Sequence, residues 1–206
     1  NSAAGSVALS RMTTKLEVMD YINYSNLRPN ESYGAFLDGQ PFTKLAFYYT
    51  TPGGTNDATP RPLQLFINEW MAQNGGFLLD PADNDRDDWF ELYSPNDAAV
   101  NLSGYYLTDD VTRPNKFQIP VGTVIAPRGY LLFWADEEGN QNRPDREVHV
   151  NFKLSATGEA IQLYSPGLSL LDSVTFGQQT NNVSQGRCPD GSANIVYFVT
   201  HPTPRG

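Results

Sequence analysis

The sequence predicts an all-β fold, built from many short strands and few helices. Apolar and polar residues alternate over short segments that are bounded by Gly, Pro, Asn and Asp, a pattern typical of strands joined by turns. The composition agrees, because 17 Gly and 15 Pro in 206 residues are typical of a chain that turns often.

The clearest strand is predicted within residues 87–95, D-D-W-F-E-L-Y-S-P. Acidic residues open it, and Ser-Pro closes it with turn-forming chemistry. Phe90 and Leu92 point to one side of such a strand, and we assign that side to the core. The other side carries Trp89, Glu91 and Tyr93.

Residues 129–135, G-Y-L-L-F-W-A, are apolar on both faces, which indicates a central strand covered on both sides. Other strands are predicted at residues 65–72, 104–108, 116–119, 148–152, 159–164, 170–176, 183–187 and 195–199. The core is predicted to contain Phe90, Leu92, Leu107, Leu132, Ile161 and Val174.

A series of motifs follows in order along residues 63–206. They include I-N-E-x-M-A from residue 67, D-W-F-E-L-Y-x-P from residue 88, N-L-S-G-Y-Y-L-T-D-D from residue 101, N-F-K-L-S from residue 151 and D-S-V-T-F from residue 172. This order resembles the lamin tail domain, in the form found on large secreted bacterial proteins. The resemblance implies an immunoglobulin-like antiparallel β-sandwich, and a place outside the cell or in the envelope of a bacterium.

The N-terminal part of the chain repeats its C-terminal part at an offset of 152 residues. Without a gap, residues 16–54 match residues 168–206. The identical pairs include Asp20/Asp172, Asn30/Asn182, Ser32/Ser184, Gly34/Gly186, Asp38/Asp190, Gly39/Gly191 and Thr51/Thr203. We therefore interpret residues 1–57 as the C-terminal half of a preceding lamin-tail-like unit, residues 58–62 as a linker and residues 63–206 as a complete domain.

Half a sandwich exposes an apolar face and an unpaired edge. Strands are predicted at residues 7–12, 20–24 and 46–49, and their apolar side chains are expected to be buried. These side chains are Val7, Leu9, Ile22, Tyr24 and Phe47. We expect the half-unit to dock on the domain of the same chain, with a homodimer formed by strand exchange as the alternative.

Charge and composition exclude several classes of function. The formal net charge is −9 and the pI is about 4.6, so no nucleic-acid partner is expected. No apolar run is long enough for a membrane span. The lone Cys188 allows no internal disulfide. Because the chain starts at Asn1 without a signal peptide, we expect it to be a piece of a longer protein.

An acidic loop is the candidate metal site, formed by Asp83, Asp85, Asp87 and Asp88. Alternate acidic residues begin a calcium-loop pattern. The pattern then breaks, since Asp88 stands where Gly is needed and Ser94 where a closing Glu is needed. A solvated acidic loop needs no ion. We therefore expect no cofactor, with weak calcium binding as the alternative.

Catalytic motifs are missing from the sequence: it has no G-x-S-x-G elbow, H-E-x-x-H helix or C-x-x-C pair. Glu69 and Glu91 could pair as glycosidase carboxylates, but a structural role within recurrent strand motifs is favoured. Four aromatic residues could instead form a sugar platform or pack against neighbouring segments. They are Trp70, Trp89, Tyr93 and Tyr105.

The resulting hypothesis is a non-catalytic structural and interaction module of a bacterial cell-surface or secreted multidomain protein. Its expected partners are other domains of the parent protein, envelope proteins or glycans. The alternative is a glycan-binding module, assisted by calcium and accessory to a catalytic domain elsewhere in the parent protein.

Overall fold

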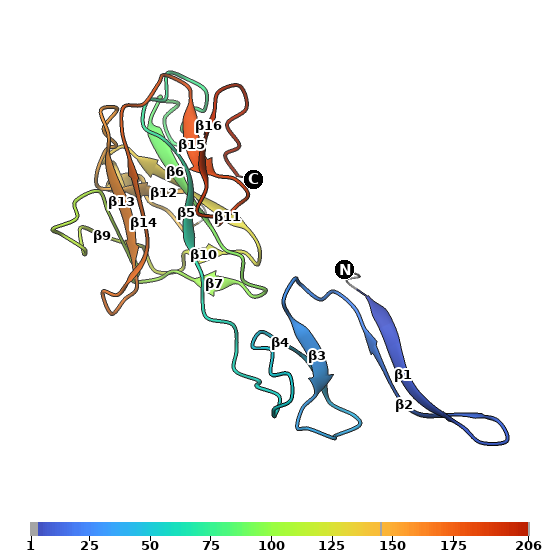
Figure 1. Cartoon of the computed structure of the whole chain (residues 1–206). Helices are drawn as coiled ribbons and strands as arrows, with labels where there is room; N and C mark the ends of the chain where they lie inside the picture. The colour runs from blue at the N-terminus through green and yellow to red at the C-terminus, as the bar shows by residue number, and fades with distance from the viewer. Residues whose placement is uncertain (1–3, 145, 206) are drawn as a thin grey trace. The chain divides into compact units, whose positions relative to one another are not determined.

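A computed structural model describes residues 4–144 and 146–205 (Figure 1). The chain divides into two compact units, unit 1 (Asn1–Pro62) and unit 2 (Leu63–Gly206). The division falls at the end of the segment 58–62 that the sequence predicts as a linker. No helix in the described part of the chain has the length and apolar character that a membrane crossing requires.

Unit 2 is a β-sandwich of a six-stranded and a four-stranded sheet. The larger sheet has the order β12-β11-β6-β5-β15-β16. Its strands are β5 (Phe66–Met71), β6 (Asp88–Tyr93), β11 (Tyr130–Ala135), β12 (Val148–Val150), β15 (Ser184–Arg187) and β16 (Ile195–Phe198). The smaller sheet, β14-β13-β8-β9, consists of β8 (Tyr106–Thr108), β9 (Phe117–Gln118), β13 (Glu159–Tyr164) and β14 (Leu170–Phe176).

The remaining elements are short. Strands β7 (Val100–Asn101) and β10 (Val124–Ile125) form a separate pair, and η1 (Gly139–Gln141) is a 3-10 turn. All strand pairs of the two large sheets are antiparallel except β11 with β12. The predicted all-β, immunoglobulin-like sandwich is confirmed. We refer to β5 to β12 as the first half of unit 2 and to β13 to β16 as its second half.

The main core lies between the two sheets. The Phe90 ring stacks on Phe133 with 5.3 Å between ring centroids, and on Phe152 at 6.1 Å. Ile161 of the smaller sheet packs into the same cluster. The prediction that Leu132 belongs to this core is wrong. Phe133 pairs with Phe90 across the strands, so Leu132 points to the opposite face of the sheet.

A second apolar cluster covers that opposite, outer face of the six-stranded sheet. It consists of the buried side chains Met71, Trp89, Leu132 and Trp134, with Leu78 packed against them. Leu78 belongs to the segment between β5 and β6, so this loop covers the outer face. The prediction that residues 129–135 form a strand covered on both sides is confirmed.

A β-bulge interrupts the alternation of β5. Ile67 pairs with Leu92, but the next pair is Glu69 with Glu91, which leaves Asn68 as the extra residue. A bulge of this kind rotates the following side chains relative to the strand. Trp70 therefore faces the main core, where its ring lies 5.7 Å from that of Phe176.

Unit 1 consists of two hairpins. The first joins β1 (Gly5–Met12) to β2 (Leu16–Tyr24), and the second joins β3 (Ser32–Ala35) to β4 (Lys44–Phe47). The predicted strands 7–12 and 20–24 lie within β1 and β2. The predicted strand 46–49 shares only residues 46 and 47 with β4.

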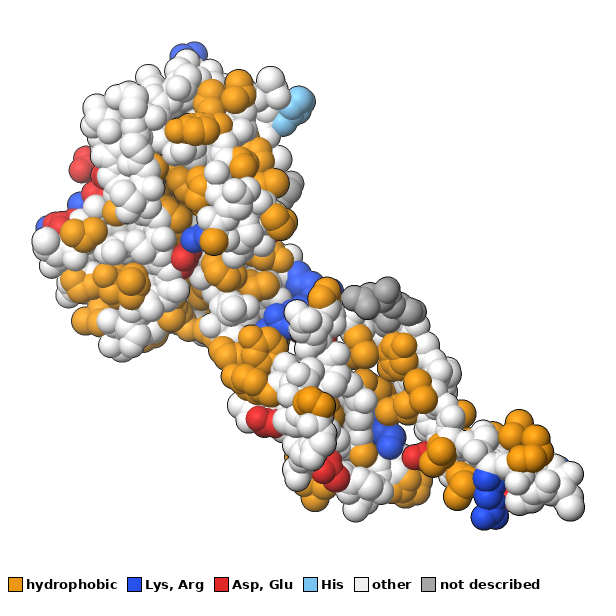
Figure 2. All heavy atoms as spheres, in the orientation of Figure 1, with side chains coloured by type: hydrophobic (Ala, Val, Ile, Leu, Met, Phe, Trp, Pro, Cys, Tyr) orange, Lys and Arg blue, Asp and Glu red, His pale blue; other side chains and the backbone are white. Residues whose placement is uncertain are grey.

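The expected burial in unit 1 is only partly right. Phe47 is buried, and Ile22 and Tyr24 are half-buried. Val7 and Leu9, in contrast, are 62% and 63% exposed. Figure 2 shows hydrophobic side chains on the surface of this unit. Within the described residues, the two hairpins of unit 1 leave these side chains uncovered.

The strands of unit 1 follow those of the second half of unit 2. β3 lies 152 residues before β15, and the β1–β2 hairpin has the same bulge as β13–β14. Leu9 pairs with Asp20 just before the bulge, as Leu163 pairs with Asp172. β4 departs from the offset by one residue, because Ser32 pairs with Phe47 whereas Ser184 pairs with Phe198.

Candidate functional site

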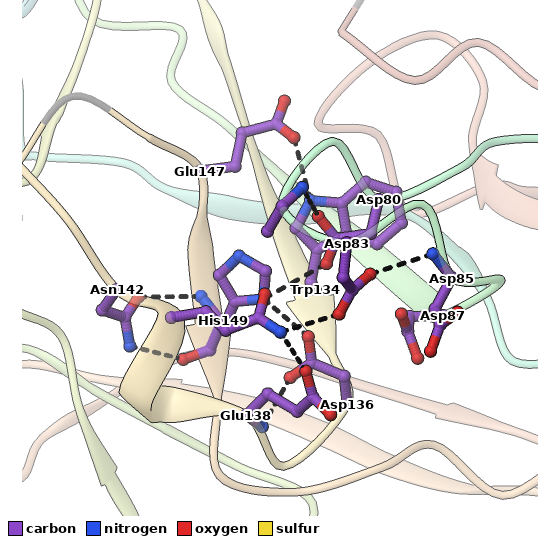
Figure 3. A network of polar contacts seen from close by, with 12 residues as sticks. Asp80, Asp83, Asp85, Asp87, Trp134, Asp136, Glu138, Asn142, Glu147 and His149 are labelled. Carbon is purple, nitrogen blue, oxygen red and sulfur yellow. Dashed lines mark hydrogen bonds and ion pairs between the residues drawn. The ribbon is translucent and has the colours of Figure 1, made fainter.

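Carboxylates from three segments gather on the outer face of the six-stranded sheet (Figure 3). We define the carboxylate cluster as Asp80, Asp83, Asp87, Asp136 and His149. The first three belong to the loop between β5 and β6, Asp136 follows β11, and His149 lies in β12. In two groups of three, Asp80/Asp136/His149 and Asp80/Asp83/Asp87, the potential ligand atoms lie within 4.8 Å of one another.

Strand alternation explains why these side chains meet. His149 pairs with Trp134 across β11 and β12, and Trp134 belongs to the outer cluster. Asp136 is two residues beyond Trp134, so it points to the same face. Val148 and Val150, on either side of His149, enter the main core instead.

His149 is held in place on both sides. Its Nδ1 lies 2.6 Å from Asp136 Oδ2 and 3.3 Å from Asp80 Oδ2. Its backbone is clamped by Asn142, whose Oδ1 accepts from His149 N at 2.9 Å and whose Nδ2 donates to His149 O at 2.8 Å. The three side chains are almost fully buried, with 0–3% exposure.

Asp80 shapes the loop that carries it. Its Oδ1 accepts from Ala82 N at 2.7 Å, and its carbonyl accepts from Asn84 N at 2.8 Å. Such bonds from an Asp side chain to the backbone two residues on are typical of tight turns. Its Oδ2 accepts no hydrogen bond within the described residues, although His149 Nδ1 lies 3.3 Å away. Burial raises the pKa of Asp80.

Asp87 and Gln141 each also carry a buried oxygen that accepts no hydrogen bond. Asp87 Oδ2 and Gln141 Oε1 are buried atoms with no hydrogen-bond partner among residues 4–144 and 146–205. Gln141 Nε2 donates to Asp83 Oδ2 at 2.7 Å and also to Glu138. Burial, followed by the charges of Asp136 and Asp83, raises the pKa of Asp87 to about 6.

Two of the four predicted metal residues belong to the cluster. Asp83 and Asp87 converge, whereas Asp85 is exposed and outside both groups. Asp88 pairs with Ala135, which faces the main core, and its Oδ1 accepts from Asn74 N at 2.9 Å. Burial raises the pKa of Asp88 to about 6.

Sequence reasoning missed Asp80, Asp136 and His149. The apolar alternation through Trp134 could have placed Asp136 on the outer face, two residues further on. No local pattern could have brought the loop that holds Asp80 over that face, because this depends on the packing of Leu78 against the outer cluster.

Glu69 and Glu91 hold the end of the chain against the sheet. Glu69 Oε1 accepts from Ser184 Oγ at 2.5 Å and from Thr203 N at 3.0 Å, and its Oε2 accepts from Thr203 Oγ1 at 2.7 Å. Glu91 Oε2 accepts from Arg205 N. Both side chains are 1% exposed, and burial raises the pKa of Glu91 to about 8. These contacts agree with the structural role favoured from the sequence.

A set of polar contacts joins β5 of the first half to the second half of unit 2. Asp172 Oδ2 accepts from Ile67 N at 2.7 Å. Asn68 donates to Asp190 Oδ1 at 2.9 Å and accepts from Gly191 N at 3.0 Å. Gly186 lies so close to β5 that a Cβ there would be 2.6 Å from Asn68 O. We call six residues of the second half the seam residues: Asp172, Ser184, Gly186, Asp190, Gly191 and Thr203.

The predicted sugar platform is wrong for its two tryptophans. Trp70 is 1% exposed in the main core, and Trp89 is fully buried in the outer cluster. Tyr93 is half-buried against Tyr130, with 5.0 Å between ring centroids. Tyr105 is half-buried against the main core. Within the described residues these four rings therefore do not form an exposed row.

A comparison with protein families matches residues 59–178 to the Lamin Tail Domain. This match covers more than half of the chain, and it includes the first half of unit 2 with the carboxylate cluster. The chain therefore belongs to the lamin tail domain family, a family of non-catalytic immunoglobulin-like modules. No curated protein matches the chain.

Proposed function

We propose that the chain is a non-catalytic structural and interaction module of a bacterial cell-surface or secreted multidomain protein. In this proposal unit 1 is an incomplete lamin-tail-like unit that binds the first half of another such unit. One observation carries it: unit 1 retains the seam residues, although none of its described strands corresponds to β5.

The retained residues are identical and lie at the offset of 152. Asp20 corresponds to Asp172, Ser32 to Ser184, Gly34 to Gly186, Asp38 to Asp190, Gly39 to Gly191 and Thr51 to Thr203. In unit 2 each of these positions contacts β5 through Ile67, Asn68 or Glu69. Folding of two hairpins alone would not require this set.

The edge that would receive a strand is open in unit 1. β15 lies between β16 and β5, whereas β3 pairs with β4 alone within the described residues. A hollow of about 590 Å³ lies beside it, lined by Val7, Leu9 and Ile22 from the first hairpin and by Ala35 and Gly39 from the second. The lining also includes the polar side chains of Asp20, Gln40 and Lys44. An unpaired edge next to such a hollow favours addition of a strand.

The occupant we propose is a segment outside residues 1–206 with the chemistry of β5 and β6, including an Ile-Asn-Glu strand. β5 of unit 2 itself is already paired on both edges, by β6 and β15. A further contact of β5 has no counterpart in unit 1: Ala35 stands at the position of Arg187, whose Nε donates to Ile67 O at 2.9 Å. The docked segment would therefore lack that hydrogen bond.

The test titrates a peptide of residues 64–95 onto the full chain and follows hydrogen exchange of the β3 amides. We expect slower exchange in β3, because its edge becomes hydrogen-bonded. A peptide with Asn68→Ala and Glu69→Ala should have no effect. In the full chain, Gly34→Ala and Ser32→Ala should weaken the effect, whereas Thr14→Ala, in the exposed turn between β1 and β2, should not.

Unchanged exchange with the wild-type peptide would overturn the proposal, and so would equal protection by both peptides. Light scattering of the full chain without peptide tests whether a second copy of the chain occupies the edge of β3. A dimer that Gly34→Ala converts to a monomer would show that a second copy fills the edge by strand exchange.

Placement at a bacterial surface rests on the resemblance of the motifs to secreted bacterial copies. Burial of Trp70 and Trp89 disfavours the glycan-binding alternative, because two of its four rings cannot contact a sugar.

A further inference from the structure

We infer that the carboxylate cluster is a binding site for one hard divalent cation of the Ca²⁺ class, ligated by Asp80, Asp83 and Asp87. This site differs from the acidic loop pattern of the sequence, since it excludes Asp85 and Asp88 and depends on the fully buried Asp80.

The first argument is the surplus of acceptors. Asp80 Oδ2, Asp87 Oδ2 and Gln141 Oε1 are buried oxygens without a hydrogen-bond donor in the described part of the chain. A buried acceptor without a donor is destabilising. Asp80 has no exposed surface at all, and it belongs to both convergent groups. A cation bound by the Asp80 and Asp87 carboxylates would offset this cost, which His149 Nδ1 relieves only in part at 3.3 Å from Asp80 Oδ2.

The second argument is geometry. The ligand atoms of Asp80, Asp83 and Asp87 lie within 4.8 Å of one another. Oxygen ligands of Ca²⁺ lie about 2.3–2.6 Å from the ion, so two of them can be up to about 5 Å apart. One ion can therefore reach all three carboxylates. Asp83 is exposed, which leaves a side of the site open to water ligands and to entry of the ion.

The third argument concerns the kind of ion. His149 Nδ1 lies 2.6 Å from Asp136 Oδ2, so this nitrogen is already engaged by the Asp136 carboxyl group. That nitrogen is then not free to ligate a metal. The available ligands are oxygens, which favour Ca²⁺ over the softer ions that bind imidazole. Asp136 and His149 act as positioning residues that border Asp80.

The experiment titrates CaCl₂ into the metal-free full chain and measures binding heat and the unfolding midpoint. We expect saturable binding with a dissociation constant of roughly 10⁻⁶ to 10⁻³ M, and a rise in the midpoint as the ion fastens the loop between β5 and β6. Asp80→Asn and Asp87→Asn should each weaken binding by about 10–100-fold. Asp85→Asn is the matched control, and it should leave binding unchanged.

For Asp87→Asn, weaker calcium binding cannot be explained by misfolding, because Asp87 Oδ2 has no hydrogen-bond partner to lose. The metal-free Asp87→Asn chain should be at least as stable as the wild type, while losing the calcium-dependent rise. Absence of heat and of any midpoint shift at about 10 mM Ca²⁺, beyond the weakest class of calcium sites, would overturn the inference. Binding of ZnCl₂ that requires His149, without binding of Ca²⁺, would also overturn it.

Discussion

Asp87 and Asp88 are neighbours in the sequence, but their carboxylates serve different surroundings. Asp87 joins the carboxylate cluster on the outer face, whereas Asp88 lies on the side of Ala135 and binds Asn74 N. Alternation along the chain separates them, because successive side chains of a strand point to opposite faces. The identity of an acidic residue thus says less about its role than its place in the strand register.

Glu91 should make the stability of unit 2 depend on pH. Burial raises its pKa from 4.5 to about 8, so the folded state keeps a proton that the unfolded state releases. The contribution of Glu91 is complete below about pH 4.5 and is lost as the pH rises toward about 8, with a slope of at most about 1.4 kcal/mol per pH unit.

Denaturant unfolding of the wild type and of Glu91→Gln at several pH values measures this contribution. The variant should lose less stability than the wild type between pH 5 and pH 8, because its amide does not ionise. Equal pH slopes for the two proteins would show that Glu91 does not titrate in this range.

At the scale of elements, β5 determines how the two halves of unit 2 fit. Its bulge at Asn68 turns Trp70 into the main core. The extra residue also places the Asn68 side chain between Asp190 and Gly191. β15 must then approach β5 closely, which requires Gly186. The same glycine in β3, Gly34, faces no such strand in unit 1.

This difference predicts that two equivalent substitutions change the stability by different amounts. Gly186→Ala places a Cβ 2.6 Å from Asn68 O and should reduce the free energy of unfolding by about 1–3 kcal/mol. Gly34→Ala meets only the Asn56 amide at 3.2 Å and Phe47 at 3.6 Å, and should change stability by less than about 0.5 kcal/mol. Chemical denaturation of both variants tests the pair. A comparable loss in the two would mean that β3 is already covered.

At the scale of the whole molecule, the two units differ in how much core they possess. The main core and the outer cluster both consist of residues of unit 2. Within the described residues, Phe47 is the one large hydrophobic side chain of unit 1 that is fully buried. Burial of such a side chain contributes roughly 1.5–3 kcal/mol, against an ordering cost of about 1–2 kcal/mol per backbone residue.

Separate production of the two units tests this comparison. Residues 63–206 should unfold in one cooperative transition, because their core is complete. Residues 1–62 should show no cooperative transition alone, and calorimetry with circular dichroism would detect one. A stable, cooperative 1–62 fragment would contradict the view that unit 1 needs a partner.

The all-β class and the positions of the strands in the two large sheets of unit 2 could be predicted from the sequence, because each segment carries its alternation and its turn-forming residues itself. For the same reason Asp83 and Asp87 could be recognised as neighbours in an acidic loop. The family was indicated separately, by the resemblance of the ordered motifs. Repetition within the chain was also visible, because it compares residues directly.

The faces and partners of individual side chains could not be read in this way. The bulge at Asn68 reverses the expected orientation of Trp70, and the pairing of Phe133 with Phe90 sends Leu132 to the outer face. Asp80, Asp136 and His149 meet only because a loop packs over β11 and β12. Each of these outcomes depends on the register between strands distant in the sequence, and therefore on the packing of the complete sandwich.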